Sequence, residues 1–303
     1  MTRRLAVLAP TLLGVTALVF LFLHLVPGDP VEIMLGESAV AVDVESLRRD
    51  LGLDRPLPEQ FVRFLGGVVR GDLGHSIAFR APVTEVIAAR YQATVELALA
   101  ALVLAVGAGI PLGMIAALQP GRAADLLIRT LSLIGVCVPS VWLGPLLILT
   151  FSIHLTWLPV SGRGSVAHLV LPAATLALGM MAILVRLTRA SMLAVLGDPY
   201  LRTAAAKGAS AFRRLTRHAL PNALPPVATV VGLQAGGLLA GAIVTETIFS
   251  WPGIGRLLVQ AIAARDYPLV QGCVLVIGFT YVLVNAAADA VVSILDPRGR
   301  DDA

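Results

Sequence analysis

Three acidic residues, Glu96, Glu246 and Asp289, each border a long apolar stretch that contains no charged residue. A charge near a membrane span is costly unless it is paired or reaches water, so such residues often mark the path of a solute. Gln234, inside one of these stretches, is polar without being charged and is suited to hydrogen bonds between helices. These four are the candidate pathway or gating residues. The simpler alternative is that the acids only reach the interface from the helix ends.

The sequence offers no pattern for catalysis, metal binding or nucleotide binding. Cys137 and Cys273 have no C-x-x-C partner. No histidine has a second possible metal ligand four residues before or after it, the spacing that would place both on one face of a helix. Neither G-x-S-x-G nor G-x-x-x-x-G-K-S/T occurs, and Lys207 is the only lysine. We therefore expect a protein that is not an enzyme, with no metal site and no cofactor of its own.

The most basic part of the chain is residues 186–221, where Asp198 is the only acid. Its positive residues are Arg186, Arg189, Arg202, Lys207, Arg213, Arg214 and Arg217. Asp198 and Pro199 suit the first two positions of a helix, and Gly208 can take the left-handed conformation that ends one. Ser210 can cap a second helix that Pro221 closes. The pattern predicts two short helices at an angle over 198–221.

On the second of these helices, Phe212, Leu215 and Ala219 are expected to share one face. A bent, small-residue projection of this kind suits docking into a groove of a partner protein. The alternative is an amphipathic helix that lies on anionic membrane lipid.

The elements that must position these residues are membrane spans. Hydrophobic residues make up 57% of the chain and charged residues 14%, against about 25% charged in ordinary soluble domains. A helix needs about 20 apolar residues to cross a bilayer. Six stretches without charge are long enough: 5–28, 97–121, 130–162, 164–185, 218–245 and 267–288. We expect an all-α integral membrane protein with about six transmembrane helices.

The first span is expected at residues 1–26, followed by a five-helix core over 91–295. Within this core, the second span is expected at about 91–118 and the third at about 126–152, which includes Pro139 and Pro145. The fifth span contains Gly232-x-x-x-Gly236 and Gly237-x-x-x-Gly241, a spacing that allows helices to approach closely.

Charge sets the expected orientation. The pI of 9.6 could suggest nucleic-acid binding, but short cytoplasmic loops of membrane proteins collect Arg and Lys, which accounts for the excess without nucleic acid. The basic N-terminus, the segment 189–221 and the tail 296–303 are therefore expected in the cytoplasm. Residues 27–90 hold ten acidic and seven basic residues and are expected outside, with helices near 44–51 and 59–69.

The segment 198–221 resembles the coupling motif E-A-A-x3-G-x9-I-x-L-P of the permease subunits of ABC importers. Aligned on Gly208, the departures at Arg202, Thr203 and His218 look like the peptide branch, where R-T-A-x-A-K-G is followed by H-A-L. The motif positions carried over are Arg202, Thr203, Ala204, Lys207, Gly208, His218, Leu220 and Pro221.

Other segments are similar to the first permease subunit of dipeptide, oligopeptide and nickel importers, closest to the dipeptide type. They are 27–30 (P-G-D-P), 51–54 (L-G-L-D), 71–74 (G-D-L-G), 245–253 (T-E-T-I-F-S-W-P-G), 265–268 (R-D-Y-P) and 296–298 (D-P-R). The resemblance covers essentially the whole chain in the same order. It implies the type I importer permease fold and a place in the inner membrane of a bacterium.

The resemblance also implies partners. They are a second permease subunit in a heterodimer, two ATP-binding subunits that bind the nucleotide, and an extracytoplasmic substrate-binding protein. The substrate it implies is a short peptide, with nickel or glutathione as alternatives. The small residues of the fifth span, Gly232, Ala235, Gly236 and Ala240, are expected to face a wide, neutral passage. A nickel path would instead need grouped ligands, and the available ones are scattered over four spans.

Two other classes compete with an importer permease. A secondary transporter would show inverted repeats and broken helices at matching positions, which the sequence does not display. An intramembrane hydrolase would need a nucleophile and base at a shared depth, and no such pair is evident. Co-purification with an ATPase would favour the importer over both.

Overall fold

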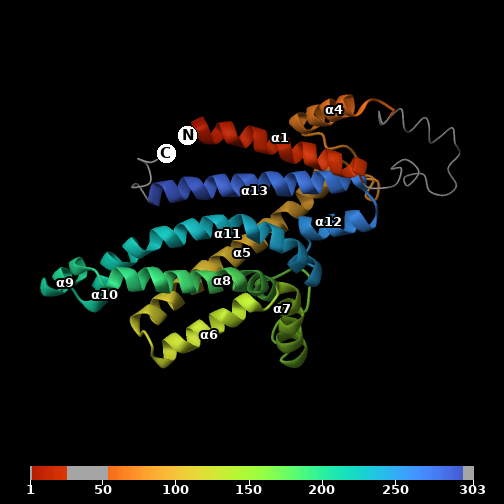
Figure 1. Ribbon diagram of the computed structural model, residues 1–303. Coiled ribbons are helices and arrows are strands. Elements are labelled where there is room, and N and C mark those ends of the chain that lie inside the picture. The colour runs from red at the N-terminus through yellow and green to blue at the C-terminus, as the bar shows by residue number, and fades with distance from the viewer. Residues whose placement is uncertain (1, 26–53, 296–303) are drawn as a thin grey trace. The chain divides into compact units, whose positions relative to one another are not determined.

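The computed structural model describes the backbone of residues 2–25 and 54–295 (Figure 1). The predicted helix near 44–51 and the tail 296–303 lie outside the described residues. The chain divides into two compact units. Unit 1 comprises Met1–Thr94 and Pro252–Val282, and unit 2 comprises Val95–Trp251 and Leu283–Ala303. Every regular element of the described part is a helix, beside one isolated β-bridge between His75 and Pro82, which confirms the all-α class.

Four of the helices are long and apolar enough to cross a membrane by themselves. They are α5 (Val83–Leu118), α8 (Val166–Leu196), the continuous helical stretch Ala211–Ile248 and α13 (Tyr267–Leu295). Helix α1 (Thr2–Leu25) has 24 residues, with a described apolar part at Pro10–Leu21. Helix α5 begins at Val83, ahead of the span start expected at 91.

The expected third span is not one helix. Helix α6 (Ala123–Cys137) is followed by α7 (Ser140–Leu147) and the π-helical segment η1 (Ile148–His154), and the chain turns by 109° between Cys137 and Ser140. Pro139 explains the break, because proline has no N–H to donate and forces the residue before it into an extended conformation. Val138 indeed has φ −79° and ψ 117°. By length and composition the bent pair makes a fifth candidate span.

In unit 1, a buried acid fastens the loop between α4 (Leu57–Arg70) and α5. Asp266 is fully buried and accepts hydrogen bonds from Ser76 Oγ at 2.5 Å and from the Ala78 N–H at 3.0 Å. Its other oxygen accepts the N–H of Leu269 at 3.2 Å, in the first turn of α13. One carboxylate thus caps α13 and holds the 76–78 loop, which gives the R-D-Y-P segment at 265–268 a structural role.

Small residues let the helices of unit 1 approach closely. A Cβ added at Gly272 of α13 would lie 2.4 Å from Val83 Cγ1 of α5, and one at Gly278 would lie 2.9 Å from Val15 Cγ1 of α1. Contacts this short do not occur with a real side chain, so glycine is required for the observed packing. Helix α12 (Ile254–Ala263) donates a hydrogen bond at its start, from the Ile254 N–H to Thr94 Oγ1 of α5 at 2.8 Å.

In unit 2, α8 packs against α6, α7 and α11 (Leu220–Ile248). Close approach again depends on glycine. A Cβ at Gly113 of α5 would lie 2.6 Å from Thr188 Cβ of α8, and one at Gly241 of α11 would lie 2.9 Å from Leu176 Cδ1 of α8. Without a hydrophobic driving force inside a bilayer, this tight packing is what holds such helices together.

Candidate functional site

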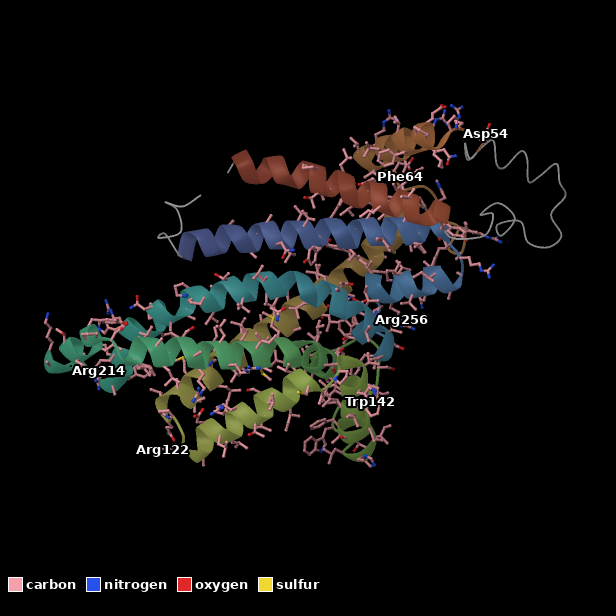
Figure 2. All side chains as sticks on the ribbon, viewed as in Figure 1. Asp54, Phe64, Arg122, Trp142, Arg214 and Arg256 are labelled. Carbon is pink, nitrogen blue, oxygen red and sulfur yellow. The ribbon has the colours of Figure 1, made fainter. Side chains whose placement is uncertain are left out.

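The basic segment 198–221 forms a projection at the end of α8, which we call the knob. Helix α9 (Pro199–Ala206) is followed by a turn, then by α10 (Ala211–Arg213) and the π-helical segment η2 (Arg214–Ala219), which runs on into α11. Figure 1 shows α9 and α10 together beyond the end of α8, and Figure 2 places Arg214 there. The two helices expected around Gly208 are therefore present.

The turn of the knob is a left-handed helix end. Gly208 has φ +82°, its N–H donates to the Ala205 carbonyl at 2.9 Å, and the N–H of Ala209 donates to the Ala204 carbonyl at 3.1 Å. This pair of bonds is the Schellman arrangement, which satisfies two carbonyls at the end of α9. Glycine suits the position because it alone takes positive φ at no steric cost. The expected helix end at Gly208 is confirmed.

The start of the second helix is also as expected, but its end is not. Ser210 caps α10 by accepting the Arg213 N–H on its Oγ at 3.3 Å. The helix continues past Pro221 into α11, whereas the sequence suggested that Pro221 closes it. The π-helical η2 supplies the physical reason. A return from wider turns to α-helical turns leaves one carbonyl unpaired, so a proline without an N–H is tolerated there.

Apolar contacts and three hydrogen bonds fix the base of the knob. Leu201 and Ala219 are buried in a cluster with Ala117, Met192 and Ala223. The Tyr200 hydroxyl donates to the His218 carbonyl at 3.0 Å, and Asn222 Nδ2 donates to both Tyr200 Oη and that carbonyl, at 2.9 and 2.7 Å. The knob is thus held on α8 and α11 as a preformed shape.

The outer surface of the knob combines positive charge with one large apolar side chain. The exposed motif residues are Arg202, Thr203, Lys207, Gly208 and Pro221. Phe212 is 76% exposed, while Leu215 and Ala219 pack inward, so these three do not share one face as expected. Ala204, His218 and Leu220 are half-buried. An exposed aromatic side chain surrounded by cations is suited to bind a groove of a partner protein that is apolar at its base and acidic at its edges.

A buried ion pair stands beside the knob, and the sequence reasoning missed it. Arg189 of α8 donates to Asp125 of α6 from two of its guanidinium nitrogens, from Nε to Oδ1 at 2.6 Å and from Nη2 to Oδ2 at 2.8 Å. Asp125 is 1% exposed and also accepts the Gly121 N–H at 2.9 Å. The pair therefore ties the turn between α5 and α6 to the part of α8 that leads into the knob. The sequence feature that could have indicated the pair is Asp125 itself, an acid in the first turn of the otherwise apolar helix α6.

Among the candidate pathway residues, Glu96 lies in an ion pair. Arg163 of the α7–α8 connection donates to Glu96 Oε2 from Nε at 2.9 Å and from Nη2 at 2.5 Å. Arg163 also lies 5.9 Å from the ring centre of the buried Trp251, and the Gly162 N–H donates to the Phe249 carbonyl at 2.9 Å. Glu96 thus takes part in fastening this connection within unit 2.

The other candidate pathway residues lie on helices other than α5, which holds Glu96. Glu246 is fully buried near the end of α11, and Gln234 is half-buried on the same helix. The side chain of Asp289 lies outside the described residues. The structure therefore leaves a pathway role for these residues as a hypothesis.

The exposed face of α11 differs from the expected one. Gly232 and Gly236 are buried, and a Cβ at Gly232 would lie 2.9 Å from Ala288 Cβ of α13. Of the four small residues expected to face a passage, Ala240 alone is exposed. The exposed residues recur with helical spacing: Asn222, Pro226, Thr229, Leu233, Gly237, Ala240, Val244 and Thr247.

The described residues hold no group of three or more His, Cys, Asp or Glu side chains that could bind a metal ion.

These features define a multi-pass helical membrane protein with a preformed knob between two spans. Comparison with known families agrees. The model of the binding-protein-dependent transport system inner membrane component matches residues 109–301, and the model of the N-terminal part of such components matches residues 1–98. The chain belongs to this family, whose members are permease components of transporters that work with ATP-binding subunits and a substrate-binding protein, and not enzymes.

Curated relatives match over nearly their full length. The chain is 44% identical to the dipeptide transport system permease protein DppB of Escherichia coli strain K12, over 98% of this chain and 97% of the relative. It is also 44% identical to the di/tripeptide transport system permease protein DppB of Pseudomonas aeruginosa, with the same coverage. The glutathione transport system permease protein GsiC of Escherichia coli strain K12 is 43% identical, again with the same coverage.

Solved structures show the same fold. An inward-facing MetNI methionine ABC transporter matches with a TM-score of 0.57 and 17% identity, over 70% of this chain and 96% of that one. An amino acid ABC transporter crystallised with histidines matches with a TM-score of 0.51 and 17% identity, over 71% and 94%. The expected ABC importer permease fold is thereby confirmed.

Proposed function

We propose that this chain is one of two different permease subunits in an ATP-driven importer of short peptides. The observation that carries the proposal is the knob: a rigidly based pair of short helices with an exposed turn at Gly208 and an exposed Phe212. Its sequence has the R-T-A-x-A-K-G and H-A-L pattern of the peptide branch. Two ATP-binding subunits dock at the knobs of the permease pair and bind the nucleotide, so this chain holds no cofactor.

Defined contacts within unit 2 connect the knob to the helices and would transmit its movement to them. Leu201, Ala219 and the hydrogen bonds of Tyr200 and Asn222 join the knob to α8 and α11. The Arg189–Asp125 pair joins α8 to the turn before α6. Closure of the ATP-binding subunits therefore moves these helices as a group, and the path opens alternately to the two sides of the membrane.

The orientation follows from charge. Both termini and the knob lie in the cytoplasm, because the basic residues gather there. Residues 27–90, with more acidic than basic side chains, lie outside the inner membrane of a bacterium. There they are positioned to meet the substrate-binding protein.

Short peptides are the proposed substrate, and glutathione is the second candidate. The relatives at 44% identity are named for dipeptide and di/tripeptide transport, and one at 43% is named for glutathione transport. Both substrates contain peptide bonds and need a wide, weakly binding passage. Nickel is the weaker alternative, because it would need grouped ligands.

The test is reconstitution of the full complex in proteoliposomes with its own substrate-binding protein, partner permease and ATP-binding subunits. Uptake of labelled dipeptide, labelled glutathione and nickel is measured with ATP inside the vesicles. We expect ATP-dependent dipeptide uptake. A complex that accumulates only glutathione or only nickel would overturn the peptide assignment, and one that imports nothing while hydrolysing ATP would overturn the importer assignment.

A further inference from the structure

Helix α4 in unit 1 has two chemically different sides. Apolar side chains occupy one broad arc: Leu57, Phe61, Val62, Phe64, Leu65, Val68 and Val69. Glu59, Arg63 and Arg70 lie on the opposite arc, since a helix turns by 3.6 residues. No residue of α4 is fully buried. The described residues therefore cover only part of the apolar side.

The covered part rests on helix α1. The ring of Phe20 lies 5.4 Å from that of Phe61 and 5.8 Å from that of Phe64, measured between centroids. Figure 2 shows Phe64 on the side of α4 next to α1. Phe20 is 8% exposed, so these contacts bury it.

The position of Phe20 fixes the depth of α4. Helix α1 ends at Leu25, and at 1.5 Å per residue Phe20 lies about 7.5 Å inside that end. A helix that packs on Phe20 lies beside the apolar part of α1 and not beyond it. Amphipathic helices in a membrane interface bury their apolar side to about 5–10 Å, which is the same depth.

The rest of the apolar side has no cover among the described residues. Val62 is 66% exposed and Val69 81% exposed, on the flank of α4 that leads away from Phe20. Arg63 and Arg70 directly follow these valines in the sequence, about 100° further round the helix, and are also exposed. Long cationic side chains at such positions reach the phosphates of lipid headgroups while their stems stay apolar.

We propose that α4 is an interfacial helix whose Val62–Val69 flank lies in phospholipid, with Arg63 and Arg70 at the headgroup phosphates. The occupant of the flank is lipid because α4 packs on α1, whose own Leu13, Leu18 and Leu21 are exposed. The inference needs only that α1 spans the membrane and does not depend on the substrate or on the proposed coupling.

Spin labels on the intact complex test the depth of α4. Cys137 and Cys273 are the two cysteines of the chain, and both are first replaced by serine and alanine respectively. Single cysteines are then introduced as Val62→Cys and Val69→Cys on the flank, with Glu59→Cys and Arg63→Cys as matched controls on the polar side. The labelled complex is placed in nanodiscs of phosphatidylethanolamine and phosphatidylglycerol, and its ATP hydrolysis confirms that it is assembled.

Collisions with oxygen, which concentrates in lipid, are compared with those of a water-soluble nickel chelate. We expect an oxygen-to-nickel ratio several-fold higher at 62 and 69 than at 59 and 63. Equal access of the nickel chelate at all four sites would overturn the proposal. The proposal would also be overturned if the nickel chelate reaches labels 62 and 69 and adding the substrate-binding protein blocks it. The flank would then be a protein-docking surface. If the label at 62 prevents assembly, position 69 gives the same measurement.

Discussion

Gly208 forms the turn of the knob. Glycine could be needed there because a side chain would clash, or because the backbone has a positive φ. No atom lies within 4 Å of a Cβ added there, while its φ is +82°. A side chain at Gly208 would therefore not clash within this subunit, but it would be strained. A left-handed conformation costs about 1–2 kcal/mol for most L-residues and less for asparagine.

We predict that Gly208→Val loses most uptake per ATP hydrolysed and that Gly208→Asn keeps most of it. Valine is β-branched and disfavours positive φ, whereas asparagine visits it. Uptake and ATP hydrolysis are measured together in proteoliposomes. Equal loss in both variants would contradict the backbone explanation and would point instead to a collision with the ATP-binding subunit.

Arg189 and Asp125 form an ion pair whose removal is expected to lower the stability of the protein. Arg189→Ala leaves a carboxylate that is 1% exposed without its cation, so we expect the variant to be less stable. Because the Arg189 side chain is itself 21% exposed, solvent compensates part of the loss. Arg189→Lys keeps the charge but not the bidentate geometry, so its loss is smaller.

A double-mutant cycle measures this contact. Unfolding of the purified complex is compared for Arg189→Ala, Asp125→Ala and the double variant. We expect the two positions to be coupled, so that the double variant loses less stability than the sum of the two single variants. Additive losses would show that the two side chains do not stabilise each other.

At the scale of elements, the glycines of α11 serve different contacts. A Cβ at Gly232 would lie 2.9 Å from Ala288 Cβ, whereas one at Gly237 would meet only Gln234 Oε1, at 4.0 Å. Gly232→Ala must therefore push α11 away from α13, while Gly237→Ala adds a methyl group to an exposed face.

We predict that Gly232→Ala lowers the melting temperature of the complex by several degrees and that Gly237→Ala leaves it unchanged or raises it slightly. Both variants remove one glycine from the same helix, so the gain in helix propensity is common to them. Thermal unfolding in detergent distinguishes them. A smaller loss for Gly232→Ala than for Gly237→Ala would contradict the packing derived from Ala288.

The elements show where the sequence was sufficient. Of the six charge-free stretches, four correspond to single helices that are long and apolar enough to cross a membrane, because a bilayer permits few alternatives to an apolar helix. Asp198, Gly208 and Ser210 predicted the knob, since helix ends depend on local backbone chemistry. The break at Pro139 was not predicted, because proline inside a membrane helix produces either a kink or a full turn, and tertiary packing decides which.

The contacts between distant residues were beyond the sequence. Glu96 drew attention as an acid near a span, but its partner Arg163 stands far along the chain. Asp266 belonged to a family-like motif whose physical role emerged only with Ser76 and Ala78. The burial of Gly232 could not be foreseen either, since composition does not reveal which face of a helix meets its neighbour.

At the scale of the whole molecule, the distribution of arginine predicts the orientation in the membrane. Asp54 precedes α4 in the segment expected outside, and Ala206 ends α9 in the knob; both are exposed. Each can carry a single cysteine in the background without native cysteines, and neither contributes a described side-chain contact. The two positions therefore report on sidedness without disturbing the fold.

We predict that Asp54→Cys is labelled by a membrane-impermeant maleimide in cells whose outer membrane has been made permeable, and that Ala206→Cys is labelled only after the inner membrane is opened. The reason is that the basic segment 186–221 is retained in the cytoplasm while 27–90, with its acidic excess, is a weak determinant that follows the spans. A permeant maleimide that reaches both cysteines is the control for exposure. Labelling of both sites from the same side would refute the proposed topology, and it would do so whatever the substrate, because sidedness depends on the spans and charges alone.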